Sequence, residues 1–265
     1  MTRDVTGDPA DGSGISDSAP GGGQAGPALW DANARAWTRA VRERRIASRT
    51  AGTDAALLDT LRAVAPRRLL DAGCGEGWLV RALRQALPAC RAIGVDGAPT
   101  LVAAARAADP VGCYHLLTYE ALAAGDWHRD PVLAERLADP LDAVVFNYAL
   151  FDCEIAQTLR AARGLLAPGG AVIVQTLPPC APGAEGWRTE DFAGFGDGSG
   201  DGSGGDGGGS GGSGGSAGWV PLRWYARSRP AWDVALAEAG LAACPHTTPD
   251  HPADPLSLLL VARPV

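Results

Sequence analysis

The sequence predicts an α/β domain in which a doubly wound, mostly parallel sheet carries helices on both faces. Short apolar runs alternate with segments of helical periodicity from residue 67 onward, which is the rhythm of βαβ units. The strand-like runs are rich in Val, Ile and Leu, as expected for parallel strands buried on both faces. A glycine-rich turn follows the first run and leads into a helix, an arrangement typical of a ligand-binding edge.

The individual elements follow in order along the chain. The stretch WDANARAWTRAVRERRIASR, which begins at Trp30, has apolar residues at nearly helical spacing, and a second helix is expected to begin at Thr53 or Asp54. Strands are predicted at 67–72, 91–96, 113–117, 141–147, 171–176 and 256–262. The stretch RPAWDVALAEAG reads as a late helix that ends at Gly240.

The chain reads as one domain with a tail and an insertion. Residues 1–27 contain almost no large apolar side chain, so they cannot bury enough surface to offset chain entropy, and we expect a disordered tail. Residues 28–265 are expected to form the domain. Within it, 197–216 have the Gly, Ser and Asp composition of a flexible loop insertion. The segment after this insertion is too short for a core of its own.

Charge and composition disfavour several kinds of partner. The net charge of −7 offers no basic field for phosphate, so neither nucleic acid nor an anionic membrane is expected to bind. The polar N-terminus does not resemble a signal peptide, and no apolar run approaches the roughly 20 residues of a membrane span. Six cysteines lie far apart without a CxxC pair, so we expect reduced thiols and no metal site. These features favour a cytoplasmic protein.

The sharpest motif is LLDAGCGEGW at 69–78, an apolar strand followed by an acid and three alternating glycines. Glycines let the backbone turn tightly and approach a ligand, and the following helix presents free N–H groups. A dinucleotide fingerprint would require its third glycine at the position of Trp78. Asp71, just before the glycines, would also repel a pyrophosphate. The motif therefore disfavours a dinucleotide and leaves the class of ligand open.

This stretch resembles motif I of the class I S-adenosylmethionine-dependent methyltransferases, in which an apolar strand, an acid, one residue and GxGxG follow one another. The resemblance implies S-adenosyl-L-methionine as the cofactor, with Gly73, Cys74, Gly75 and Gly77 in the loop that holds it. It also assigns to Asp71 the positioning of the ligand's α-amino group, usually through water. The charges agree, because this ligand offers an ammonium group where a dinucleotide offers phosphate.

Other stretches extend the resemblance. AIGVDGAPTLVAAA resembles the family's second motif, which makes Asp96 the carboxylate that accepts hydrogen bonds from both ribose hydroxyls. LDAVVFNYALF resembles the fourth-strand motif and places Asn147 near the methionine part, although Asn147 could instead cap a following helix. Tyr119 and Glu120 lie where the family contacts adenine. Arg49 is a candidate for the ligand's carboxylate, with a solvated helix end as the alternative.

Four segments resemble a narrower bacterial branch, the type 11/12 methyltransferases related to ubiquinone-pathway O-methyltransferases: NARAWTRAVRERRIASR, QTLPP, EGWRTEDFAGF and RWYARSRPAW. The resemblance implies a Rossmann-like sheet of seven strands with a C-terminal antiparallel strand and an N-terminal helical lid. It also implies methyl transfer to a small molecule, on an oxygen, with nitrogen as the less favoured alternative. Trp30 and Trp37 then belong either to the core or to the lid. Pro178 stands where this branch is expected to have His, so no catalytic residue is assigned.

The acceptor site is expected at the end of the fifth strand and on two aromatic segments after it, since connections beyond the carboxyl ends of strands supply specificity. The candidate residues, for which packing is the competing interpretation, are Gln175, Trp187, Trp224, Tyr225 and Arg227. In this hypothesis Arg227 selects a carboxylate or phenolate on the acceptor. The identity of the acceptor and the oligomeric state are not predicted.

Two other functions are compatible with parts of the sequence. Pro178 leaves open a non-catalytic S-adenosylmethionine-binding protein. An NAD(P)-dependent oxidoreductase is disfavoured by Trp78 and Asp71. The four histidines have no partner at ligand or triad spacing and are expected to be structural or exposed, namely His115, His128, His246 and His251.

Overall fold

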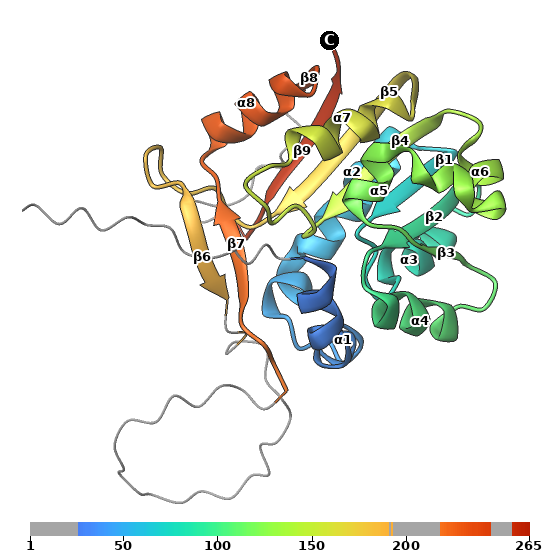
Figure 1. The fold of residues 1–265 in the computed structure, drawn as a ribbon, viewed down its shortest axis with the longest axis horizontal. Coiled ribbons are helices and arrows are strands. Elements are labelled where there is room, and N and C mark those ends of the chain that lie inside the picture. The colour runs from blue at the N-terminus through green and yellow to red at the C-terminus, as the bar shows by residue number, and fades with distance from the viewer. Residues whose placement is uncertain (1–25, 191, 193–217, 245–255) are drawn as a thin grey trace, which may run out of the picture.

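The computed structural model describes residues 26–190, 192, 218–244 and 256–265 (Figure 1). Nearly all of the expected tail, the whole insertion 197–216, and both His246 and His251 lie outside these residues. The assignment of 28–265 to a single domain therefore stays a prediction. No helix in the described ranges combines the length and apolar character needed to cross a membrane.

A seven-stranded sheet forms the centre of the fold, as the family resemblance implies. Its strands lie in the order β3-β2-β1-β4-β5-β9-β8. Strands β1 to β5 run parallel, and β9 pairs antiparallel with both β5 and β8. The bounds are β1 Arg68–Ala72, β2 Arg91–Asp96, β3 Cys113–Leu116, β4 Leu141–Asn147, β5 Leu166–Thr176, β8 Leu241–Ala243 and β9 Leu258–Pro264. β5 begins at Leu166, five residues before the predicted strand.

Helices cover both faces of this sheet. One face packs α2 (Asp54–Val64) and α3 (Trp78–Ala86) against strand residues such as Leu69 and Val145. The other face packs α5 (Tyr119–Ala124), α6 (Pro131–Leu137), α7 (Ala156–Gly164) and α8 (Arg229–Glu238) against residues such as Leu70 and Phe146. Adjacent strand residues thus enter opposite cores, because side chains alternate across a strand. Helix α4 (Pro99–Ala108) follows β2, and short helical turns span Arg49–Thr53 and Asp126–Arg129.

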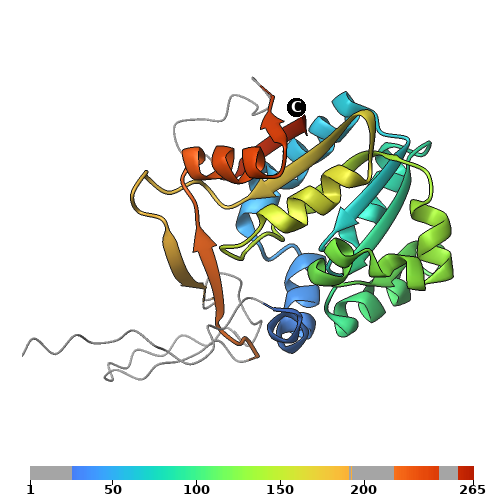
Figure 2. The ribbon, with the colours of Figure 1, turned by 45° about the horizontal axis from the view of Figure 1, so that its top comes forward.

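Helix α1 (Pro27–Arg42) lies beyond the carboxyl ends of the parallel strands (Figures 1 and 2). Pro27 suits the first helical position, where its missing N–H needs no partner. One side of α1 packs against α4, and its Ala34 and Ala40 are buried. The helix therefore stands where the resemblance implies a lid.

A two-stranded ribbon, which the sequence did not indicate, stands beside α1. It consists of β6 (Gly186–Glu190) and β7 (Leu222–Ala226), which pair antiparallel outside the main sheet (Figure 1). The two strands are the aromatic segments expected at the acceptor site. Their pairing brings together chain segments on either side of the insertion.

Candidate functional site

A cavity of about 310 Å³ opens at the carboxyl ends of the parallel strands, between the sheet, α1 and the ribbon. Its size lies at the lower end of the range of roughly 300–1,000 Å³ typical of small-molecule sites. Eight of the predicted site residues line it: Arg49, Gly73, Cys74, Gly75, Asp96, Tyr119, Asn147 and Trp224. Glu120 also lines it. Asp71, Gly77, Gln175, Trp187, Tyr225 and Arg227 do not line this cavity.

The glycine loop follows β1 and forms part of the cavity wall. Gly73 has a φ of 84°, in the region that favours glycine, and a Cβ there would meet the Tyr119 hydroxyl at 2.5 Å and Ala149 at 2.6 Å. The amides of Gly73 and Cys74 both donate to the carbonyl of Val95, at 2.8 and 2.9 Å. The loop is thus fixed on the neighbouring strand, and the missing side chain leaves its backbone accessible.

Asp96 ends β2 and holds the same loop from the other side. Its Oδ2 accepts from the Gly75 amide and its Oδ1 from the Ala98 amide, both at 2.8 Å. Burial raises the pKa of Asp96, and these amides partly oppose that effect. Because each carboxylate oxygen has a second acceptor position, both remain able to accept from a diol.

Asp71 lies within β1 and is buried, with 1% of its surface exposed. Its Oδ1 has no hydrogen-bond partner among the described residues. Burial, and then repulsion by Asp96, raises the pKa of Asp71 to about 8. A buried carboxyl group without a partner is costly, and a nearby positive charge would relieve that cost. Its place behind the cavity wall is consistent with a contact through water.

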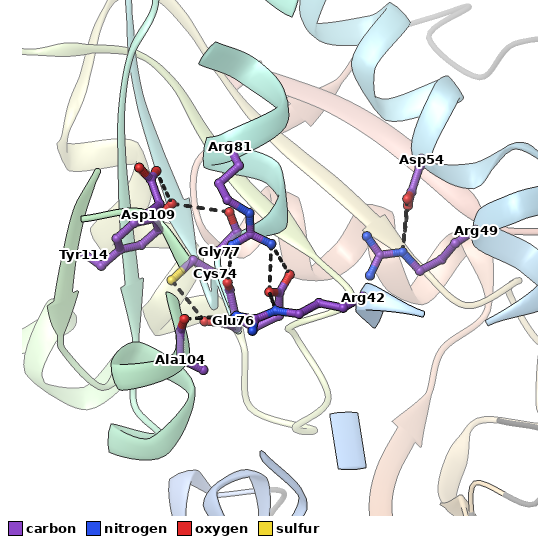
Figure 3. Close-up of polar contacts among 11 residues, drawn as sticks. Arg42, Arg49, Asp54, Cys74, Glu76, Gly77, Arg81, Ala104, Asp109 and Tyr114 are labelled. Atoms are coloured by element: carbon purple, nitrogen blue, oxygen red, sulfur yellow. Dashed lines mark hydrogen bonds and ion pairs between the residues drawn. The ribbon is translucent and has the colours of Figure 1, made fainter. Parts of the chain in front are cut away.

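Glu76, in the middle of the glycine loop, was missed by the sequence reasoning. Its side chain is buried and accepts from Arg42 Nε at 2.9 Å and from Arg81 Nη2 at 2.7 Å (Figure 3). Arg42 also donates to the carbonyl of Ala104 in α4. The cluster therefore ties the end of α1 to the glycine loop and to α4. The sequence offered one sign of it, an acid within an otherwise apolar loop and a basic residue five positions later.

Arg49 lines the cavity beside the start of α2. Its Nε donates to both carboxylate oxygens of Asp54, at 2.9 and 3.1 Å (Figure 3), and its guanidinium lies 4.3 Å from the ring centroid of Trp78. These contacts hold the side chain over the glycine loop. Arg49 is therefore ordered at the cavity wall, where its remaining N–H groups can donate to an anionic group.

Two further residues line the wall between β1 and β4. Asn147 ends β4, and its Oδ1 is buried without a partner among the described residues. No helix begins until Ala156, so Asn147 does not serve as the helix cap considered above. The Tyr119 hydroxyl lies 3.3 Å from the carbonyls of Ala72 and Ala149, which places its ring across the entrance to the loop.

Trp30 and Trp37 on α1 combine the two roles considered for them. Both line the cavity and both pack in its apolar surroundings. Their ring centroids lie 5.4 Å apart at an angle of 76°, and Trp30 stacks on Phe151 at 5.7 Å. The helix thus presents an aromatic wall to the cavity.

The register of the ribbon separates the aromatic acceptor candidates. Trp187 lies opposite Tyr225, whereas Trp224 lies opposite Arg188 and Leu222 opposite Glu190. Opposite residues share a face and neighbours alternate, so Trp224, Leu222 and Glu190 face the same way and line the cavity. Trp187 and Tyr225 lie on the other face, where their rings pack edge to face at 5.6 Å.

Arg227 and Gln175 are also buried away from the cavity wall. A guanidinium nitrogen of Arg227 donates to the carbonyl of Asp152, and the group lies 5.1 and 5.2 Å from the rings of Tyr225 and Trp232. Burial lowers its pKa. The Nε2 of Gln175 donates to the Thr53 carbonyl at 2.8 Å and thereby ties β5 to the start of α2. The side chains of Arg227 and Gln175 therefore hold neighbouring backbone segments together and do not face the cavity.

His115 has partners that sequence spacing did not indicate. Its Nε2 lies 3.3 Å from Cys113 Sγ and its Nδ1 lies 2.7 Å from Asp130 Oδ2. Cys113 and His115 are two positions apart on β3 and so share a face, but Asp130 arrives from a distant loop. Burial raises the pKa of Cys113. The six cysteines are all free thiols.

Fold and site together define a Rossmann-like protein with a cavity at the carboxyl ends of its strands. Similarity to known proteins indicates the class of protein to which this fold belongs. Residues 70–172 match the family model described as a methyltransferase domain. A malonyl-[acyl-carrier protein] O-methyltransferase of Dechloromonas aromatica is 33% identical over 124 residues, 46% of this chain and 41% of that protein. An uncharacterized methyltransferase of Mycobacterium bovis is 36% identical over 46% of this chain and 56% of that protein. The chain spans about half the length of the curated relatives it matches.

Solved structures share the fold. DesVI of Streptomyces venezuelae has a TM-score of 0.52 at 15% identity, over 87% of this chain and 98% of that chain. The CcbJ methyltransferase of Streptomyces caelestis has a TM-score of 0.51 at 19% identity, over 94% of each chain. The family match makes residues 70–172 a methyltransferase domain, and the described residues share the fold of S-adenosylmethionine-dependent methyltransferases. S-adenosyl-L-methionine is the cofactor of this class.

Proposed function

We propose that this protein transfers a methyl group from S-adenosyl-L-methionine to an oxygen atom of a small molecule. The observation that carries the proposal is the meeting of three features around one cavity: the open glycine loop at Gly73, the Asp96 carboxylate, and the unpartnered Oδ1 of Asn147. A curated relative that is itself named an O-methyltransferase supports oxygen as the accepting atom.

The described residues fit the cofactor in both shape and charge. Asp96 would accept from the ribose hydroxyls, and Tyr119 would border the adenine. Asp71 would act on the α-amino group through water, while Arg49 would donate to the carboxylate. When bound, the cofactor supplies a methyl group on a sulfonium. The orphaned Oδ1 of Asn147 is an acceptor that suits the ammonium end of such a ligand.

The protein would contribute position and exclusion of water rather than an assigned base. Aromatic side chains from α1 and the ribbon wall the cavity, so an acceptor bound there is shielded from solvent. Holding the acceptor oxygen and the methyl donor together supplies much of the acceleration in a bimolecular transfer. Pro178 is exposed and does not line the cavity, so it offers no group for proton transfer.

The absence of a His at position 178 favours a second candidate function, a protein that binds the cofactor without transferring its methyl group. Both candidates require the same cofactor site, so binding alone does not separate them. Transfer of the labelled methyl group to any of a panel of hydroxylated small molecules would establish the enzyme. Retention of the label on the cofactor across the panel would favour the binding protein.

Calorimetry tests the ligand class directly. The full chain should bind S-adenosylhomocysteine and should not bind NAD, because Trp78 replaces the third glycine of a dinucleotide site. Tighter binding of NAD than of S-adenosylhomocysteine would contradict the proposal and favour an oxidoreductase.

A further inference from the structure

We infer that the acceptor end of the cavity is built for a molecule with an apolar, ring-sized body and a positively charged amine. The acceptor end is defined here as the part lined by α1, the β4–α7 connection and the ribbon. The inference rests on the proposed function and names the chemical class of its acceptor. It also replaces the hypothesis that Arg227 selects a carboxylate or phenolate.

Aromatic and aliphatic side chains form the walls of the acceptor end. Trp30 comes from α1, Phe151 from the β4–α7 connection, and Leu222 and Trp224 from the ribbon, and all four line the cavity. Phe192, two positions after the end of β6, lines it as well and is 2% exposed. Such walls bind a flat apolar body, and the faces of aromatic rings attract cations.

The charged groups of the acceptor end are carboxylates. Asp152, Glu154 and Glu190 line it, and none of them has a salt-bridge partner in the described part of the chain. Glu190 accepts from the Phe192 amide at 2.8 Å through Oε1, which fixes it beside an aromatic wall. Its Oε2 has no hydrogen bond among the described residues. Three negative charges thus border an apolar space.

Basic residues near the acceptor end do not balance these charges. Arg49 is the one base among the described lining residues, and it is paired with Asp54 over the glycine loop. Arg227 does not line the cavity, and its positive charge offsets part of the negative charge of Asp152 and Glu154. Its guanidinium donates to the backbone carbonyl of Asp152 and not to a carboxylate. Arg188 shares the cavity face of the ribbon, yet it is exposed and donates to the Ala184 carbonyl at 2.7 Å. The net charge presented to an acceptor is therefore negative.

These contacts discriminate by attraction and repulsion together. An ammonium group on the acceptor is attracted by the carboxylates and by the faces of the aromatic rings. A carboxylate in the same place is repelled, and it would lose its hydration without a basic side chain to pair with. Because the carboxylates are partly exposed, the preference should weaken as salt increases.

The test uses three phenols of similar size that differ in charge: tyramine, 4-ethylphenol and 3-(4-hydroxyphenyl)propionate. Each is titrated by ligand-observed NMR into the full chain saturated with S-adenosylhomocysteine, so the readout is binding rather than turnover. We expect tyramine to bind at least about tenfold more tightly than the propionate, with 4-ethylphenol between them. The double variant D152N/E190Q should lose most of this preference. The double variant E135Q/D139N removes the same charge from exposed positions outside the cavity and should keep it.

Equal binding of the three phenols, tighter binding of the propionate, or no detectable binding of tyramine would overturn the inference. So would an unchanged preference in D152N/E190Q. Saturation with S-adenosylhomocysteine is measured first by calorimetry, and its failure would contradict the proposed function instead. The two failures are therefore distinguishable.

Discussion

Asn33 and Val220 hold each other by two reciprocal hydrogen bonds, although 187 positions separate them in the sequence. The Asn33 amide donates to the Val220 carbonyl at 2.9 Å, and the Val220 amide donates to Asn33 Oδ1 at 2.7 Å. Asn33 is fully buried on α1, and Val220 lies two residues before β7. The pair thus joins the two elements that close the cavity.

Replacing Asn33 should loosen this closure. In Asn33→Ala the backbone groups of Val220 lose their partners, so the free energy of unfolding should fall by about 1–3 kcal/mol. S-adenosylhomocysteine should also bind more weakly, because Trp30 and Trp37 on the same helix line its cavity. Urea unfolding and calorimetry measure the two effects. Arg35→Ala, at an exposed position of α1, should change stability by less than about 0.5 kcal/mol. Equal effects of the two variants would show that the pair does not secure the helix.

Asp96 should carry much of the cofactor affinity. In Asp96→Ala the ribose hydroxyls of the ligand lose their hydrogen-bond acceptor, and the Gly75 amide also loses the carboxylate to which it donates. The lost hydrogen bonds should cost about 1.5–3 kcal/mol of binding free energy. S-adenosylhomocysteine should therefore bind at least about tenfold more weakly. Calorimetry gives the dissociation constant, and thermal unfolding shows whether the variant is folded. A folded Asp96→Ala that binds as tightly as the parent would rule out the ribose assignment.

The raised pKa of Asp71 predicts a pH dependence of binding. With a pKa of about 8 in the free protein, Asp71 is mostly protonated at pH 6. An ammonium group on the ligand favours the carboxylate, so binding should release a proton, and affinity for S-adenosylhomocysteine should rise as the pH increases from 6 to 8. The rise should level off above the pKa of the free protein.

Calorimetry at several pH values, in buffers with different ionisation enthalpies, measures both the affinity and the proton released. Asp71→Asn is the control, because the amide cannot titrate, and its affinity should change less with pH. The same slope in parent and variant would assign the pH dependence to another group.

Glu76 should stabilise the fold through its two arginine partners. Glu76→Gln leaves Arg42 and Arg81 facing a neutral side chain, and losing charge-assisted hydrogen bonds should lower the free energy of unfolding by about 1.5–3 kcal/mol. Asp59→Asn removes the acid of an exposed ion pair with Arg62 and should cost less than about 1 kcal/mol. Urea unfolding compares the two variants. Similar losses in both would mean that burial of Glu76 adds nothing to its ion pairs.

Trp224 and Tyr225 provide a matched pair on opposite faces of β7. Trp224→Ala removes part of the cavity wall, so it should weaken binding of the acceptor probes at least about tenfold while leaving S-adenosylhomocysteine binding nearly unchanged. Tyr225→Ala should affect stability but not probe binding, because its ring packs on Trp187 away from the cavity. If the same NMR titration shows that Tyr225→Ala weakens probe binding more than Trp224→Ala does, the acceptor site lies on the outer face of the ribbon.

The sequence by itself determined most of the sheet and predicted which residues border the cavity at the glycine loop. Strand β2 at 91–96 and strand β4 at 141–147 have the predicted bounds, because continuous Val, Ile and Leu runs between helices leave few alternatives. Asp96 and the glycine loop line the same cavity for a related reason. The loop and the strand ends are local features, and parallel topology places all carboxyl ends at one edge.

Only the tertiary structure decided which aromatic side chains line the proposed acceptor end. Trp187, Trp224 and Tyr225 share composition and neighbourhood in the sequence, so nothing local distinguished them. The antiparallel register of β6 and β7 made that distinction, because it sets which face of the ribbon each side chain occupies. The contacts of Glu76 with Arg42, of His115 with Asp130 and of Asn33 with Val220 likewise join separate segments of the chain. Contacts of this kind depend on how helices and loops pack around the sheet, and no periodicity along the chain encodes them.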